Sequence, residues 1–204
     1  MKAITSISIK LLFLSLLLNI SISNRVDRAV CSTTKGDFEI LIEHKDIPIA
    51  AKRLVDLIKE GFFTNTAFHH VTPNYMACFG IPEKPFRHVN HWSKTPINHE
   101  HYMDNHVKTF DLYFYEDITK KDRKFMMWIA LAPIGYLKGE QKVANIVSGQ
   151  DVILKLNSEY TDEPDIDRIL DKGNDYLKKK FPNLDYIKSC SISTKPGDNP
   201  HDEM

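Results

Sequence analysis

The sequence predicts a mainly β fold, a closed antiparallel barrel whose ends are covered by helices. Short strand-like runs recur at close intervals, which is the spacing typical of an antiparallel barrel or sandwich. Helical periodicity lies mainly before and after these runs. The chain has 204 residues, of which 42% are hydrophobic, enough for one substantial core and too few for two domains of ordinary size. One β-rich domain is therefore expected.

The first elements show the change from strand to helix periodicity. Residues 37–43 alternate polar and apolar side chains, so Phe38, Ile40 and Ile42 should face away from the acidic residues of the same strand. Residues 48–62 then carry apolar side chains at helical spacing and begin with a proline, which suits a first helical turn. This second segment is predicted to be an amphipathic helix that lies on the rest of the domain.

The remaining elements are mostly short strands. They are expected at residues 67–71, 75–81, 108–115, 125–132 and 142–147. A second helix, a charged helical stretch and a closing strand follow at residues 150–156, 165–180 and 185–192.

The two ends of the chain predict export. Residues 11–20 form an apolar segment of about ten residues, too short for a typical transmembrane helix, and Ser21 and Ser23 offer the small side chains of a cleavage site. Residues 1–23 are therefore predicted to be a signal peptide, with a retained membrane anchor as the alternative. Residues 195–204 are predicted to be a disordered tail, and its last residues, HDEM, are close to an HDEL retention signal. The expected location is secreted or the lumen of the endoplasmic reticulum.

Charge and histidine content argue against other classes of ligand. Lys plus Arg and Asp plus Glu both total 27, so the net charge does not favour nucleic acid as a partner. Seven of the nine histidines fall between residues 69 and 106, but their spacing matches no defined metal motif. We therefore expect no metal and no cofactor.

Several motifs in the first half of the chain resemble the cyclophilins, the barrel-shaped peptidyl-prolyl isomerases. TTKG at residues 33–36 is similar to the opening of the short single-domain members, AFHHV at 67–71 to their x-F-H-R-[IV] strand, and PNYMACFG at 73–80 to P-x-F-M-x-Q-G-G. In the second half, MMWIA at 126–130 and GYLKG at 135–139 are similar to the family motifs Q-F-F-I-[TC] and x-W-L-D-G. The resemblance implies a closed eight-stranded barrel at residues 31–194, capped by two helices, with an extra helical insertion near 163–181.

The resemblance also implies a site. In the family an apolar pocket holds the proline ring, and an arginine donates a hydrogen bond toward the proline nitrogen. His70 occupies the arginine position, so it is the expected catalytic residue, and it is shorter and offers fewer donors than arginine. The implied substrate-binding residues are Phe68, Tyr75, Met76, Cys78, Trp128, Tyr136, Leu137 and Gln141.

A weak peptidyl-prolyl cis-trans isomerase of the secretory pathway is therefore expected, a monomer that binds proline-containing segments of client proteins and assists their folding. Two alternatives stay open. The first is a catalytically inactive binding module, and the second is a membrane-anchored subunit of a complex, with membrane contact only if residues 1–23 are retained.

The three cysteines permit one disulfide and leave one free thiol. The first and last strands of the cyclophilin barrel are neighbours, so the resemblance implies a Cys31–Cys190 disulfide. Cys78 would then carry the free thiol.

Overall fold

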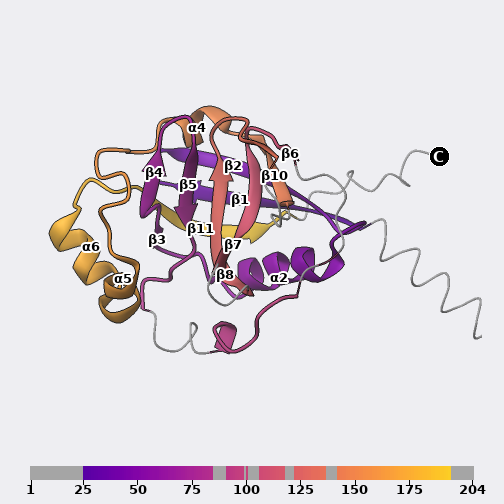
Figure 1. Ribbon diagram of the computed structural model, residues 1–204, viewed down its shortest axis with the longest axis horizontal. Coiled ribbons are helices and arrows are strands. Elements are labelled where there is room, and N and C mark those ends of the chain that lie inside the picture. The colour runs from indigo at the N-terminus through magenta and orange to yellow at the C-terminus, as the bar shows by residue number, and fades with distance from the viewer. Residues whose placement is uncertain are drawn as a thin grey trace, which may run out of the picture.

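The computed structural model describes residues 25–84, 91–98, 100, 106–117, 122–136 and 142–193. These residues form a mainly β fold, as the sequence predicts (Figure 1). The predicted signal peptide and tail lie outside them. Within the described part of the chain, no helix combines the length and the apolar composition needed to cross a membrane.

One large antiparallel sheet makes up most of the fold. Its nine strands lie in the order β3-β11-β1-β2-β10-β7-β8-β5-β4. Their bounds are β1 Val26–Thr33, β2 Gly36–Glu43, β3 Thr66–Ala67, β4 His70–Thr72, β5 Met76–Phe79, β7 Asp111–Asp117, β8 Asp122–Ala130, β10 Lys142–Ser148 and β11 Tyr186–Ile192. A separate pair consists of β6, His106–Val107, and β9, Gly135–Tyr136. The first strand begins at Val26, upstream of the expected domain start at residue 31.

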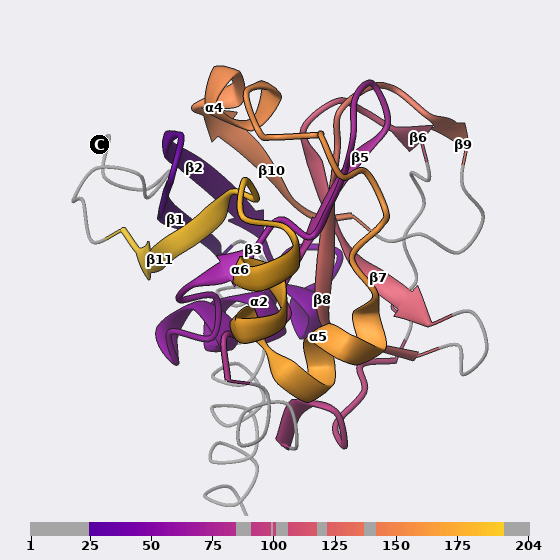
Figure 2. The same ribbon diagram turned by 90° about the vertical axis from the view of Figure 1, so that its left-hand side faces the viewer.

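The large sheet closes because its two outermost strands are parts of one segment, residues 66–72. On one side β3 pairs with β11, and on the other β4 pairs with β5. The backbone changes partner between them, since Phe68 N–H donates to the Asp185 carbonyl at 2.9 Å and His69 N–H to the Cys78 carbonyl at 3.1 Å. This change splits one expected strand into two, so the sheet contains nine strands where eight were predicted. Figure 2 shows the sheet curling round on itself.

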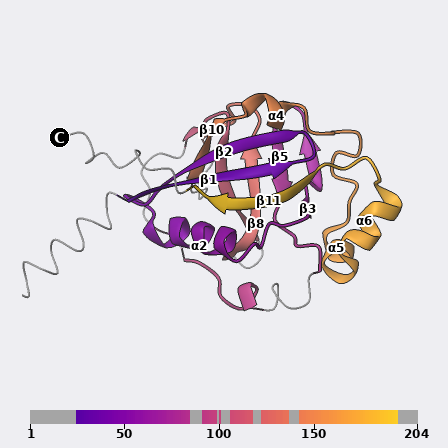
Figure 3. The same cartoon turned by 180° about the vertical axis from the view of Figure 1, so that it is seen from behind.

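Two helices lie at the ends of the barrel (Figure 3). Helix α2, Pro48–Lys59, has its proline in the first turn and buries one face against the core. It ends before the predicted residue 62 because the chain turns at Gly61, which has a positive φ of 67°. Helix α4, Gln150–Leu154, is also shorter than expected. It starts after Gly149, where a Cβ would lie 2.3 Å from the Asp37 carbonyl oxygen.

The charged stretch after α4 forms two helices, α5, Ile166–Lys172, and α6, Asn174–Lys180. They enclose a small second core at the side of the barrel, which contains Ala67, Ile81, Ile169, Leu177, Phe181 and Leu184. The predicted helical insertion therefore forms and packs onto the barrel through its own apolar side chains.

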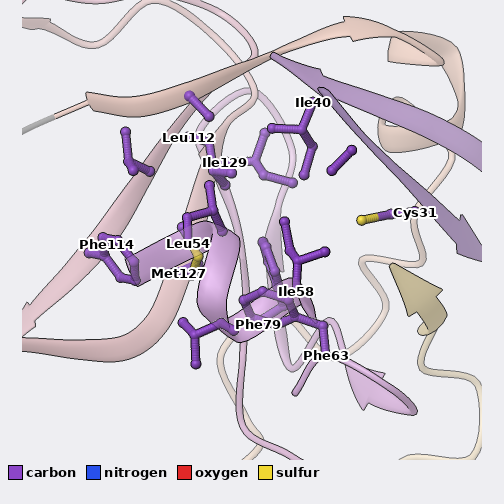
Figure 4. Packing of buried hydrophobic residues seen from close by; sticks show 14 of the residues in the cluster. Cys31, Ile40, Leu54, Ile58, Phe63, Phe79, Leu112, Phe114, Met127 and Ile129 are labelled. Carbon is purple, nitrogen blue, oxygen red and sulfur yellow. The ribbon is translucent and has the colours of Figure 1, made fainter. Parts of the chain in front are cut away.

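The main core fills the barrel and extends to α2. Figure 4 shows this packing, with Ile40, Leu112, Phe114 and Ile129 from the sheet close to Leu54 and Ile58 of the helix. The strand at 36–43 buries Phe38, Ile40 and Ile42 and leaves the acidic side chains outside, which confirms the alternation seen in the sequence.

Residues 91–97 pack against α2. Trp92 is buried in the main core, and the Arg53 guanidinium lies 4.5 Å from the centre of its ring. Arg53 also donates to the carbonyls of Thr95 at 2.6 Å and Lys124 at 2.9 Å, and the Trp92 indole N–H donates to Glu60 at 3.1 Å. These contacts anchor residues 91–97 at the α2 end of the barrel.

Cys31 and Cys190 form a disulfide between β1 and β11, where the two residues lie directly opposite each other. Cys78 is a buried free thiol. The cross-link therefore joins the first strand of the barrel to the last.

Candidate active site

A row of four side chains crosses four neighbouring strands. His70 of β4 lies opposite Cys78 of β5, Cys78 opposite Trp128 of β8, and Trp128 opposite Tyr113 of β7. Directly opposite residues of an antiparallel sheet point to the same face. We call these four residues the outer row.

The outer row faces away from the barrel interior. The strand neighbours of its members, including Val71, Ala77 and Ile129, belong to the main core, so alternation turns the row outward. Cys78, Trp128 and Tyr113 instead form a separate apolar cluster with Val107 and Ala130, against which Met76 and Ile134 pack. The barrel thus carries a buried apolar cluster on the outer side of these strands, with a histidine at one end of the row.

His70 is half-buried, and its Nε2 lies 2.9 Å from the Thr72 hydroxyl oxygen. Both residues belong to β4, separated by Val71. The structure therefore places the expected catalytic residue beside the apolar cluster, with one ring nitrogen already hydrogen-bonded to the protein.

The two sulfur side chains of β5 contact each other. The Cys78 thiol donates to the Met76 thioether sulfur at 3.4 Å. Burial raises the pKa of the Cys78 thiol to about 12, so it is neutral at physiological pH. A neutral, internally bonded thiol gives the cluster little polarity at this position.

Trp128 is only 3% exposed, and Tyr113 covers one of its faces. The two rings stack with centroids 4.4 Å apart and planes at 14°. This pair forms a rigid aromatic base for the cluster. Sequence reasoning missed Tyr113 as a residue of the site. The available signal was its place between Leu112 and Phe114 in a predicted strand, because alternation puts it on the opposite face from these two buried residues.

Tyr75 and Phe68 differ sharply in position. Tyr75 is 43% exposed in the turn between β4 and β5, directly before Met76. Phe68 is fully buried in the main core, with its ring centroid 5.5 Å from that of Phe79. The expectation that Phe68 contacts substrate is therefore wrong, because its side chain points into the barrel.

The last three expected site residues are described incompletely. The backbone of Tyr136 lies in β9, opposite His106 of β6. This strand pair borders the cluster, because Val107 of β6 is a member of it and Ile134, directly before β9, packs against it; Ile134 N–H donates to the Val107 carbonyl at 3.3 Å. The Tyr136 side chain, Leu137 and Gln141 lie outside the described residues.

Among the described residues, no group of three or more His, Cys, Asp or Glu side chains is arranged to hold a metal ion. His88, His99 and His101 lie outside the described part of the chain. Of the other histidines of that stretch, His91 lies beside Trp92 at the α2 end, and His106 lies in β6.

His69, the neighbour of His70, is buried, and its Nδ1 has no hydrogen-bond partner among the described residues. Burial, and to a smaller extent the neighbouring His70, lowers the pKa of His69 to about 4. The folded protein therefore keeps this imidazole neutral well below the ordinary histidine pKa of about 6.5.

This burial predicts a loss of stability on acidification. Below about pH 6.5 His69 is protonated in the unfolded chain, whereas in the folded chain it stays neutral down to about pH 4. The free energy of unfolding therefore falls as the pH is lowered across this window. At pH 5.5 the loss from this group should be about 1 kcal/mol. Urea unfolding at pH 7.5 and 5.5 measures this change in the free energy of unfolding. The change should be smaller by that amount in His69→Gln than in wild type, because the contribution of the carboxylates is the same in both proteins. An equal pH dependence in both would contradict the prediction.

The chain matches one protein-family model. The model is described as cyclophilin type peptidyl-prolyl cis-trans isomerase, and it matches residues 29–175. This range includes all four residues of the outer row.

Curated relatives match over shorter stretches. The chain is 34% identical over 55 residues to the peptidyl-prolyl isomerase cwc27 of Rhizopus delemar, covering 27% of this chain and 10% of that protein. It is 32% identical over 75 residues to the spliceosome-associated protein CWC27 homolog of Xenopus laevis, covering 31% and 16%. It is 33% identical over 45 residues to the peptidyl-prolyl cis-trans isomerase A of Dickeya dadantii, covering 22% and 24%. The matched stretches thus span a quarter or less of each relative.

Solved structures match over most of the chain. A crystal structure of a cyclophilin type peptidyl-prolyl cis-trans isomerase from Cryptosporidium parvum superposes with a TM-score of 0.63 at 17% identity, covering 84% of this chain and 100% of that one. A second crystal structure of that protein, in the presence of the dipeptide Ala-Pro, gives a TM-score of 0.61 at 17% identity, covering 82% and 99%. These matches show that the two proteins share a fold.

Proposed function

Because the chain belongs to the cyclophilin-type peptidyl-prolyl cis-trans isomerase family, we propose that the outer row binds proline-containing segments of client proteins and accelerates their cis-trans isomerisation weakly. One observation carries this proposal. The register of β4, β5, β8 and β7 brings a hydrogen-bond donor, His70, into line with the apolar cluster that contains Cys78 and Trp128.

The reaction needs few catalytic groups. Rotation about an X-Pro amide crosses a barrier of about 18–20 kcal/mol without breaking a covalent bond. When the amide twists, its nitrogen loses conjugation and becomes a hydrogen-bond acceptor. A donor placed at this nitrogen stabilises the transition state and not the planar ground state, which is the requirement for catalysis.

The outer row offers both parts of such a site. Beside the row, the half-buried Met76 supplies apolar surface for a proline ring and packs against the cluster that contains Trp128, and the neighbouring Tyr75 is exposed. His70 supplies an imidazole N–H as the donor. Weak activity is expected, since this donor is shorter than the arginine of the family and the buried Cys78 offers no charged or amide group to the substrate.

We also propose that the protein acts in the secretory pathway. Disulfides persist mainly in oxidising compartments, and the Cys31–Cys190 bridge suits such a location. The apolar segment at residues 11–20 and the HDEM terminus support export and retention in the endoplasmic reticulum. Assistance to the folding of secreted proteins would follow from that location.

A binding module without catalysis is the second candidate. It is favoured by the hydrogen bond between His70 Nε2 and Thr72, which occupies one of the two ring nitrogens. If Nδ1 does not reach the prolyl nitrogen, the apolar cluster can still bind a proline-containing loop.

A protease-coupled isomerisation assay on an X-Pro peptide tests the proposed function. The wild-type chain should accelerate the slow phase, and His70→Ala should lower kcat/KM about tenfold, the loss expected for one modest hydrogen bond in the transition state. His91→Ala is the matched control, because His91 lies beside Trp92 at the α2 end, and its activity should equal that of wild type.

Peptide titration by NMR separates the two candidates. The chain has two tryptophans, and the indole N–H signal of Trp128 should shift on addition of an Ala-Pro peptide. The indole N–H of Trp92 donates to Glu60 at the α2 end and should stay unchanged, so it serves as an internal control. A shift at Trp128 without any acceleration by the wild-type chain would sink the isomerase proposal and support the binding module.

A further inference from the structure

Among the described residues, Thr72 is the one side chain that forms a hydrogen bond with His70, the proposed donor. Their side chains share the outer face, since Val71 between them belongs to the main core. Thr72 lies opposite Met76, two residues beyond His70 in β4, so this pair is next to the outer row on the same face of the sheet. It can therefore act on His70 without itself occupying a position in that row.

The surroundings of Thr72 fix the position of its hydroxyl. The Thr72 carbonyl accepts from Tyr75 N–H at 3.1 Å, which closes the turn after β4. The preceding residue is held too, because Val71 N–H donates to the Thr161 carbonyl at 3.2 Å. Threonine is branched at Cβ and has a restricted χ1 angle, so a fixed backbone also orients its hydroxyl.

The 2.9 Å contact can be made in two ways. A neutral imidazole carries one N–H, and its other nitrogen is an acceptor. If Nε2–H donates to Thr72, Nδ1 has no proton and His70 offers no donor to a substrate unless it becomes charged. If the Thr72 hydroxyl donates to Nε2, the ring proton is on Nδ1.

Both arrangements pair one donor with one acceptor, and they differ in the groups that stay free: the first leaves the Thr72 hydroxyl proton and the Nδ1 lone pair, and the second leaves Nδ1–H. Among the described residues, the contact with His70 is the one hydrogen bond of the Thr72 hydroxyl. Only by donating to Nε2 does that hydroxyl leave the neutral imidazole with an N–H, at Nδ1, that is free to donate to a substrate. The Cys78 thiol is neutral and donates to Met76, so it is not a thiolate that would accept the Nδ1 proton of His70.

We infer that Thr72 is a positioning residue: its hydroxyl donates to Nε2 of His70 and holds the neutral imidazole in the tautomer whose Nδ1–H can donate to a prolyl nitrogen. The choice between the two arrangements rests on the proposed function, because only the second leaves an imidazole N–H for the substrate. A partner that fixes the histidine tautomer is a known requirement where histidine acts in catalysis.

The tautomer can be measured without any substrate. Long-range ¹⁵N–¹H correlation spectra of the full chain distinguish Nδ1–H from Nε2–H imidazoles, and the absence of one signal set in His70→Ala assigns His70 among the nine histidines. We expect the Nδ1–H form in wild type, its loss as the dominant form in Thr72→Val, and its return in Thr72→Ser, which keeps the hydroxyl. An unchanged His70 spectrum in Thr72→Val would overturn the inference.

Kinetics then test the consequence for catalysis. Thr72→Val should lower kcat/KM about tenfold while the peptide-induced shift at Trp128 is retained, and Thr72→Ser should recover most of the loss. In the His70→Ala background Thr72→Val should have no further effect, since Thr72 acts only through His70. A further loss in that background would overturn the positioning role. If the spectra change as expected but no variant accelerates isomerisation, the proposed function fails and the tautomer assignment stands.

Discussion

Replacing Cys31 and Cys190 by alanine is expected to lower the free energy of unfolding by about 5 kcal/mol. The two residues are separated by 159 positions, so the bridge closes a loop that includes nearly all of the barrel. In the chain-entropy model a loop of this length restricts the unfolded chain by about that amount. The loss is comparable with the whole stability of many domains, and the melting temperature should fall by about 10–20 °C.

Urea unfolding with and without reductant measures the same effect without mutation. Reduced wild type should match the double-alanine variant apart from the packing lost at Cys31, which is buried in the core. Cys78→Ala is the matched control, because it removes the free thiol and leaves the bridge, so reductant should destabilise it as much as wild type. A loss below about 1 kcal/mol on reduction would contradict the prediction.

Replacing His70 by arginine is expected to raise kcat/KM for X-Pro isomerisation by about 10²- to 10³-fold. Removal of a single preorganised donor from a transition-state site costs about this factor, and the substitution adds a longer side chain with more donors at the same position of β4. The gain requires that the apolar cluster of Met76, Cys78 and Trp128 already accepts a proline ring. The same coupled assay measures it.

His70→Lys separates geometry from charge. Lysine adds a positive charge of similar reach but lacks the planar set of donors, so it should recover much less activity than arginine. Equal rates for the two variants would show that charge alone is sufficient. If His70→Arg does not accelerate isomerisation although the Trp128 signal still shifts with peptide, the pocket binds without placing the prolyl nitrogen near position 70.

Sequence patterns predicted most elements of this fold because their side-chain period is local. The alternation at residues 36–43 and the helical spacing that starts at Pro48 are visible in short windows, and both elements form there. Motifs spaced along the chain then indicated the family and the expected site. The ends of α2 and α4 were less predictable, since local turns decide where a helix stops.

The sequence by itself therefore determined the β-rich class, the family resemblance and the histidine at the expected donor position. Only the tertiary structure decided which apolar residues of one short stretch face inward, because the backbone changes partner between Phe68 and His69 and puts Phe68 in the core. It also decided which distant residues meet. Tyr113 stacks on Trp128 because β7 and β8 pair in one register, and a register between strands depends on the packing of the whole barrel, which no local pattern contains.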